Sequence, residues 1–135
     1  MPDIKIYSPD TLGKPLGPYS QITRVKASEF LFIAGQVATD RAGNLVGPDD
    51  FDAQCRQTYA NIKTALESAG ASWANVVEFT TYLVHSQDIA KFMAFRRREF
   101  PQMFTNNAYP PNTLLIVDRL VQEGFLIEVQ TVAAL

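Results

Sequence analysis

The chain has 135 residues, with 12 Lys or Arg and 14 Asp or Glu, and carries a net charge of −2. This length suits a single domain over residues 1–135, and the lack of excess positive charge argues against nucleic acid as a partner. The only cysteine, Cys55, excludes an intramolecular disulfide and favours a reducing compartment, so we expect a cytoplasmic protein.

Two strands are predicted in the first third of the chain. Residues Ser20–Lys26 alternate between apolar and polar side chains, as in a strand with one buried face. Residues Phe30–Val37 form a nearly continuous apolar run, which is typical of a strand buried on both faces. Residues 27–29 are the expected turn between them. The run is far shorter than the roughly 18 apolar residues of a membrane span, so no membrane contact is expected.

The clearest local signal is an amphipathic helix that starts near residue 51. Its apolar residues recur every three or four positions and fall on one stripe. Asp49 or Asp50 is placed to cap its start, and Gly70 is placed to end it in the left-handed conformation. The residues of the stripe are Phe51, Cys55, Tyr59, Ile62, Leu66 and Ala69.

The second half of the chain returns to strand periodicity before a second helix. Residues Val76–Val84 place alternate apolar side chains on one face and predict a long strand. A helix is predicted over residues 87–100, capped by Ser86 and ended by Pro101. We expect Ile89, Phe92, Met93 and Phe100 to form its buried face.

Two last strands are predicted at Thr113–Leu120 and Phe125–Ala133, joined by residues 121–124 as a hairpin turn. The element order then indicates an α+β fold in which both helices pack on one face of a mostly antiparallel mixed sheet. The last strand carries aliphatic side chains on both faces. A soluble protein commonly buries such a second face by forming a closed homo-oligomer.

Several short motifs in this order resemble the RidA family of imine and enamine deaminases, also described as endoribonuclease L-PSP-like. The resemblance covers nearly the whole chain. It implies a chorismate-mutase-like domain, a trimeric barrel with ligand sites between subunits, and a small imine or enamine as the ligand. The motifs are Gly17-Pro18-Tyr19-Ser20-Gln21, Phe32-Ile33-Ala34-Gly35-Gln36, Tyr109-Pro110, Arg119-Leu120 and Ile127-Glu128-Val129.

The resemblance implies that Glu128 positions the water that attacks the imine carbon and that Tyr19 forms part of the pocket wall. Hydrolysis of an imine needs an oriented water and a group that shuttles a proton. A partly buried carboxylate can shuttle the proton. The alternative for Glu128 is a structural sheet residue paired with an arginine such as Arg119. The alternative for Tyr19 is an aromatic ring packed under a loop.

Four further residues belong to the predicted substrate site. Gly35 lies inside a predicted strand, where glycine favours close approach of a ligand. Its neighbour Ala34 replaces the serine common in the deaminases, and Leu114 lies in the same implied pocket. Asn112 stands where those deaminases hold an arginine that clamps the substrate carboxylate, so a bidentate charged contact is lost and a different substrate range is expected.

Another arginine could replace the missing clamp, with Arg24 and Arg96–Arg98 as candidates. The family's second-helix asparagine is also absent, with Met93 near its place. His85 is the only histidine and Cys55 reads as a buried apolar residue, so neither a metal nor any other cofactor is expected. The competing hypothesis is a non-catalytic module that binds a small ligand or another protein. A ribonuclease or translation-inhibiting role has less support.

Overall fold

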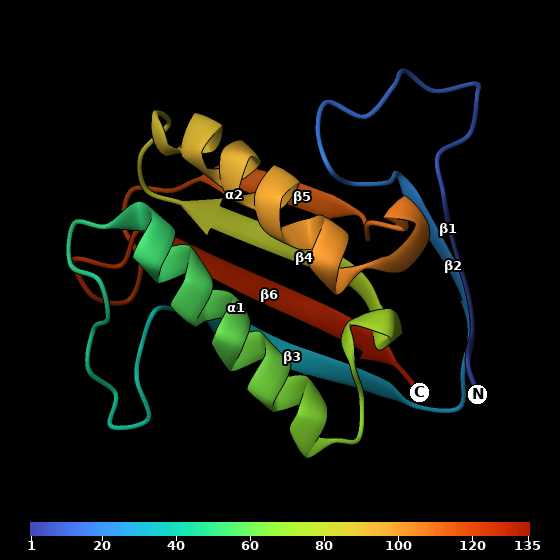
Figure 1. Ribbon diagram of the computed structural model, residues 1–135, viewed down its shortest axis with the longest axis horizontal. Coiled ribbons are helices and arrows are strands. Elements are labelled where there is room, and N and C mark those ends of the chain that lie inside the picture. The colour runs from blue at the N-terminus through green and yellow to red at the C-terminus, as the bar shows by residue number, and fades with distance from the viewer.

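The computed structural model describes residues 1–135 and contains six strands, two α-helices and two short 3-10 turns (Figure 1). In chain order the elements are β1 (Asp3–Tyr7), β2 (Ile22–Lys26), β3 (Phe30–Gln36), α1 (Phe51–Ser68), η1 (Trp73–Asn75), β4 (Val76–Leu83), α2 (Asp88–Met103), η2 (Thr105–Asn107), β5 (Asn112–Ile116) and β6 (Ile127–Ala134).

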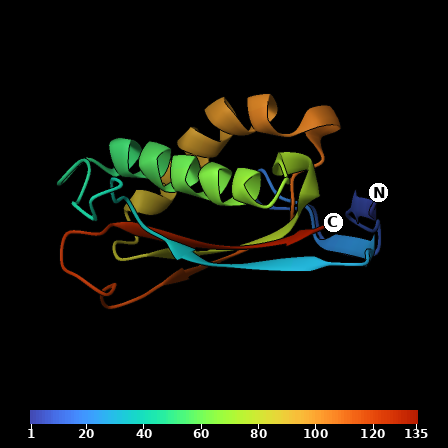
Figure 2. The same cartoon turned by 90° about the horizontal axis from the view of Figure 1, so that it is seen from below.

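The main sheet has four strands in the order β3-β6-β4-β5, and β1 pairs with β2 in a separate ribbon. Strand β6 is antiparallel to both β3 and β4, whereas β4 and β5 are parallel and are joined through α2. Both helices lie on one side of this sheet, and its other side is left open (Figure 2). The predicted α+β architecture with two helices on one face of a mixed sheet is confirmed.

The first helix follows its sequence signals. The Asp50 side chain accepts a hydrogen bond of 3.0 Å from the Ala53 N–H and so caps the helix start. Gly70, two residues after the last helical residue, takes a φ of +74°, a conformation that residues with side chains rarely adopt. Its apolar stripe is buried from Phe51 to Leu66, whereas Ala69, predicted as the last member of the stripe, follows the helix and is exposed.

The second helix differs from the prediction at both ends. Ser86 does not cap it with its side chain, because the Ile89 N–H bonds to the backbone carbonyl of Ser86 instead. Pro101 does not end it, and the helix continues to Met103. Ile89 faces solvent, whereas Phe95 joins Phe92 and Phe100 in the core.

The core lies between the helices and the sheet and is rich in aromatic rings. The ring of Tyr59 in α1 packs 5.8 Å from that of Phe79 in β4 and 5.3 Å from that of Phe95 in α2, measured between centroids. Phe100 and Phe104 extend this cluster with a centroid distance of 5.1 Å. Aromatic contacts therefore fix both helices against the middle of the sheet.

The predicted pairing of the last two strands is wrong. Residues 121–124 do not form a hairpin, because β5 ends at Ile116 and pairs with β4, while β6 is inserted between β3 and β4. Strand β3 is not buried on both faces, because Phe32 is 79% exposed. Its predecessor β2 pairs with β1, a strand that the sequence analysis did not predict.

Candidate active site

Glu128 lies in β6 on the open face of the sheet, opposite Tyr82 of β4. It forms no ion pair and no side-chain hydrogen bond within the chain. Arg119 does not pair with it, since the Arg119 guanidinium contacts Glu123 at 3.6 Å and the Leu120 carbonyl at 3.1 Å. The predicted alternative of an Arg119–Glu128 pair is therefore wrong, and the carboxylate is left without a cation.

Burial raises the pKa of the Glu128 carboxyl above its usual value. A neighbouring cation would favour the charged form and lower the pKa, but no such group is in contact with Glu128. A carboxyl group in this environment exchanges a proton closer to neutral pH than an exposed glutamate does.

Gly35 brings the backbone of β3 against this carboxylate. The register between β3 and β6 shifts between Ile33 and Gln36, which places one extra residue on β3 as a β-bulge. A methyl group added to Gly35 would overlap the carboxylate of Glu128. Ala34, in the same bulge, is exposed. The structure thus brings together Ala34, Gly35 and Glu128.

Tyr19 is presented by a turn that is anchored on two sides. Its hydroxyl oxygen accepts a hydrogen bond of 3.1 Å from the Leu16 N–H, and its own N–H donates to the carbonyl of Gly17 at 2.8 Å. The next residue, Ser20, donates its N–H to the carbonyl of Tyr109 at 3.1 Å. The turn is therefore fixed to the segment that leads into β5.

Asn112 and Leu114 lie in β5 and are half-buried. They pair with Phe79 and Thr81 of β4, whose side chains are buried beneath the helices. The Asn112 side-chain oxygen accepts a hydrogen bond of 2.7 Å from the Thr81 hydroxyl. Because paired residues of neighbouring strands share a face, Asn112 and Leu114 lie on the helix side, whereas Glu128 lies on the open side. A single chain does not bring these groups together.

The candidate replacement arginines differ sharply in their surroundings. Arg24 is exposed on the β1–β2 ribbon, and Arg97 is exposed on α2. Arg98 is half-exposed and pairs with Asp52 at 2.6 Å and with Glu99 at 3.2 Å. Arg96 alone is buried, with 2% of its surface exposed, and it lies under the turn that presents Tyr19.

The remaining titratable candidates form no site. His85 is exposed, and no three His, Cys, Asp or Glu side chains converge as ligands of a metal would. Cys55 is buried in the core, where burial raises the pKa of its thiol and keeps it protonated. Neither helix is both long enough and apolar enough to cross a bilayer.

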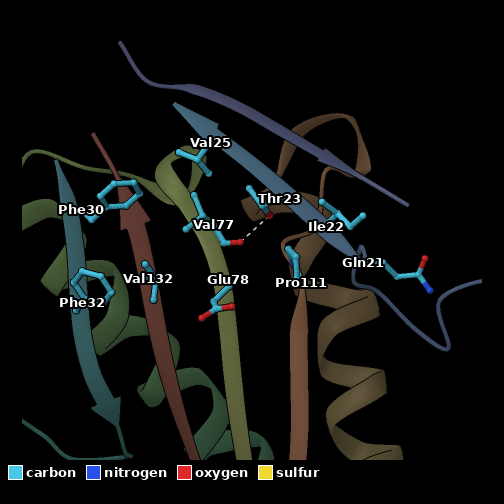
Figure 3. Close-up of a pocket in the computed structure, with 10 residues that line it drawn as sticks. All are labelled: Gln21, Ile22, Thr23, Val25, Phe30, Phe32, Val77, Glu78, Pro111 and Val132. Carbon is cyan, nitrogen blue, oxygen red and sulfur yellow. Dashed lines mark hydrogen bonds between the residues drawn. The ribbon is translucent and has the colours of Figure 1, made fainter. Parts of the chain in front are cut away.

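An apolar groove that was not predicted from sequence lies on the open face of the sheet, between β2, β3 and β4 (Figure 3). Its volume is about 540 Å³, and Phe30, Phe32 and Val132 line one side. Across the groove the Thr23 hydroxyl donates a hydrogen bond of 2.7 Å to the Val77 carbonyl. The signal for this groove was the alternation of Phe30 and Phe32, which points both rings to one face of the strand.

Comparison with known proteins agrees with this fold. Residues 11–135 match the family model described as endoribonuclease L-PSP. A RutC family protein of Pyrococcus horikoshii is 38% identical over 120 residues, covering 89% of each chain. Another of Synechocystis is 32% identical over 133 residues, covering 98% of this chain and 97% of its own.

Solved structures of Rid family proteins are also similar to this chain. YyfB of Yersinia pestis, from the conserved Rid protein family, is 33% identical and superimposes with a TM-score of 0.80 over 98% of each chain. RidA of an Antarctic Psychrobacter is 27% identical with a TM-score of 0.67, covering 97% of this chain and 99% of its own. The chain therefore belongs to the Rid/RutC family of endoribonuclease L-PSP-like proteins.

Proposed function

We propose that this protein hydrolyses a small reactive imine or enamine, releasing ammonia and a carbonyl product, with a substrate range different from that of the 2-imino-acid deaminases. The observation that carries the proposal is Glu128, a partly buried carboxylate without a cation that lies against the Gly35 bulge. The likeness of the chain to imine and enamine deaminases supports it.

In this mechanism Glu128 takes a proton from water while the water oxygen attacks the imine carbon. Glu128 passes this proton to the imine nitrogen, so that the first product is a neutral carbinolamine. Glu128 then moves the proton of the carbinolamine hydroxyl to the nitrogen, the C–N bond breaks to release ammonia, and the C–O bond becomes the carbonyl. The sum is one imine and one water converted to one ammonia and one carbonyl compound. An enamine would enter after protonation at carbon.

The catalytic site is completed between two copies of the chain. Glu128 and Gly35 lie on the open face, whereas Asn112 and Leu114 lie on the helix side. The turn that presents Tyr19 packs beside them, against Met93 and Arg96 of α2. These groups can face one ligand only if the open face of one subunit meets the β5 edge of another. We therefore propose a homotrimer with ligand sites between subunits, in agreement with the implied family assembly.

Asn112 determines the difference in substrate range. Its amide is neutral, and its oxygen already accepts one hydrogen bond from Thr81, whereas its amide N–H groups have no hydrogen-bond partner in the chain and can donate to a ligand. At this position a carbonyl or hydroxyl group of the substrate is a better match than a carboxylate. A charge-assisted hydrogen bond contributes about 1.5–3 kcal/mol, so an arginine here would favour 2-imino acids by two or more orders of magnitude.

The test is ammonia release from freshly generated imines by the native protein and three variants. Glu128→Gln should reduce the rate about 10²- to 10⁴-fold, the usual contribution of a general acid or base. Asn112→Arg should raise the rate on 2-imino acids about 100-fold. The control is Gln102→Ala, an exposed position on α2 away from the open face, which should leave the rate unchanged. If neither the native protein nor Asn112→Arg turns over any imine, the chain is a binding module and the proposal fails.

A further inference from the structure

Arg96 is a buried cation that the proposed chemistry has not used. It lies in the middle of α2 with 2% of its surface exposed, whereas Arg97 and Arg98 beside it face solvent. None of the ion pairs in the chain includes Arg96. A fully buried arginine is normally paired with an anion, because a guanidinium does not give up its proton as a buried lysine can.

The contacts of this guanidinium are weak ones. It lies over the Phe92 ring, 4.4 Å from the centroid, and Nη2 contacts the thioether sulfur of Met93 at 2.9 Å. The Nε and Nη1 groups are buried and have no hydrogen-bond partner. A thioether is a poor acceptor, so the guanidinium retains nearly all of its capacity to bind an anion.

Arg96 faces the turn that presents Tyr19. A methyl group added to Gly17 would overlap Met93 and lie 3.6 Å from Arg96 Nη2. Burial lowers the pKa of Arg96, and Tyr59 and Tyr19 are close enough to oppose that shift. The same turn is bonded through Ser20 to Tyr109, three residues before Asn112. The cation therefore belongs to the neighbourhood of Tyr19 and the start of β5.

We propose that Arg96 binds the carboxylate of the ligand, so that the anion is held from α2 rather than from β5. This inference rests on the proposed function and specifies its substrate class as small anionic carbonyl, imine or enamine compounds. A carboxylate that displaces the Met93 sulfur exchanges a weak contact for charge-assisted hydrogen bonds to Nε and Nη groups. Because the carboxylate is held from α2 and not from β5, the preferred substrate should have a different distance between its carboxylate and its C=N group from that of the substrates of the arginine-bearing deaminases.

The test compares carboxylates with their uncharged amides in a binding experiment that needs no turnover. Two probe pairs are titrated by calorimetry: pyruvate with pyruvamide, and 4-oxopentanoate with its amide. The two acids differ in the distance between the carboxylate and the ketone carbon. The native protein should bind the acid of at least one pair about 10- to 100-fold more tightly than the amide. Arg96→Met should lose this preference, whereas Arg97→Met, the exposed neighbour, should keep it.

Binding of the carboxylate by Arg96 does not depend on turnover by Glu128. Glu128→Gln should retain the preference for the acid while losing ammonia release, so failure of turnover does not remove the binding result. Arg96→Gln serves as a second variant if Arg96→Met does not fold. The inference is overturned if the native protein binds acid and amide equally in both pairs, or if the preference survives substitution of Arg96. A crystal structure of the native complex with the carboxylate bound elsewhere would overturn it as well.

Discussion

At the scale of single residues, Glu128 links the chemistry of the site to the stability of the fold. Its carboxyl group is partly buried, no cation compensates its charge, and burial raises its pKa. Folding therefore favours the protonated form of Glu128, and ionisation at higher pH acts against the folded state. The proposed water activation needs ionised Glu128, although the folded state is more stable when this carboxyl group is neutral.

This raised pKa predicts a pH-dependent stability difference between the native protein and Glu128→Gln. Below the ordinary glutamate pKa of about 4.3, Glu128 is neutral in both states and costs nothing. As the pH rises through the folded-state pKa, the native protein should lose stability relative to the variant. Urea unfolding at a series of pH values from 4 to 7 measures the difference. Gln102→Ala, an exposed change on α2 that alters no titrating group, should follow the native curve, and a flat difference for Glu128→Gln would contradict the assignment.

At the scale of secondary structure elements, Gln54 connects α1 to the segment that enters β6. Its side chain is fully buried and accepts a hydrogen bond of 2.8 Å from the Leu126 N–H. Its amide nitrogen donates to the carbonyls of Gly124 at 2.8 Å and Gly47 at 3.1 Å. One side chain thus satisfies three backbone groups in two connecting segments, and it fixes where the chain turns into the central strand.

Replacing Gln54 with leucine should destabilise the fold strongly. The change leaves one N–H and two carbonyl groups without their partner, at a cost of about 1–3 kcal/mol for a buried group left unsatisfied. We expect a loss of about 2–5 kcal/mol in the free energy of unfolding, measured by urea denaturation. The exposed Gln102→Leu should change it by no more than about 0.5 kcal/mol. A Gln54→Leu protein as stable as the native one would show that this connection does not support the fold.

Apart from β1, the strands and α-helices were predictable from sequence because each depends on local periodicity, but strand pairing was not. Residues 113–120 and 125–133 are adjacent in sequence, and the short segment between them favoured a hairpin. The structure instead pairs β5 with β4 in parallel through the α2 crossover and inserts β6 between β3 and β4. That choice depends on which faces are buried together, and local sequence does not carry this information.

The candidate site shows the same limit. The sequence identified Glu128 and Gly35 through their motifs, and their contact across the bulge emerges only when β3 and β6 pair. The sequence also offered Arg96–Arg98 as replacements for the missing clamp, but it did not show which of the three faces the interior. Helical geometry separates neighbouring residues by about 100°, so only one of the three can face the interior, and packing against Phe92 selects Arg96.

At the scale of the whole molecule, the open face of the sheet is the strongest argument for assembly. Phe30 and Phe32 are 47% and 79% exposed, and they border the apolar groove beside Val132 (Figure 3). This face also carries Glu128 and Gly35, whereas Asn112 and Leu114 lie on the helix side. Association through the open face would bury the aromatic rings and complete the site in one step.

Phe32→Glu should therefore abolish both assembly and ammonia release. Three chains of 15.0 kDa give an expected native mass of about 45 kDa by light scattering after size exclusion, and the variant should elute as a single chain. Ile89→Glu places the same charge on an exposed apolar residue of the helix layer and should keep both mass and activity. Because the variant changes no residue proposed to touch the ligand, loss of turnover would follow from separating the two halves of the site. A native protein that is a single chain and still releases ammonia would contradict a site shared between subunits.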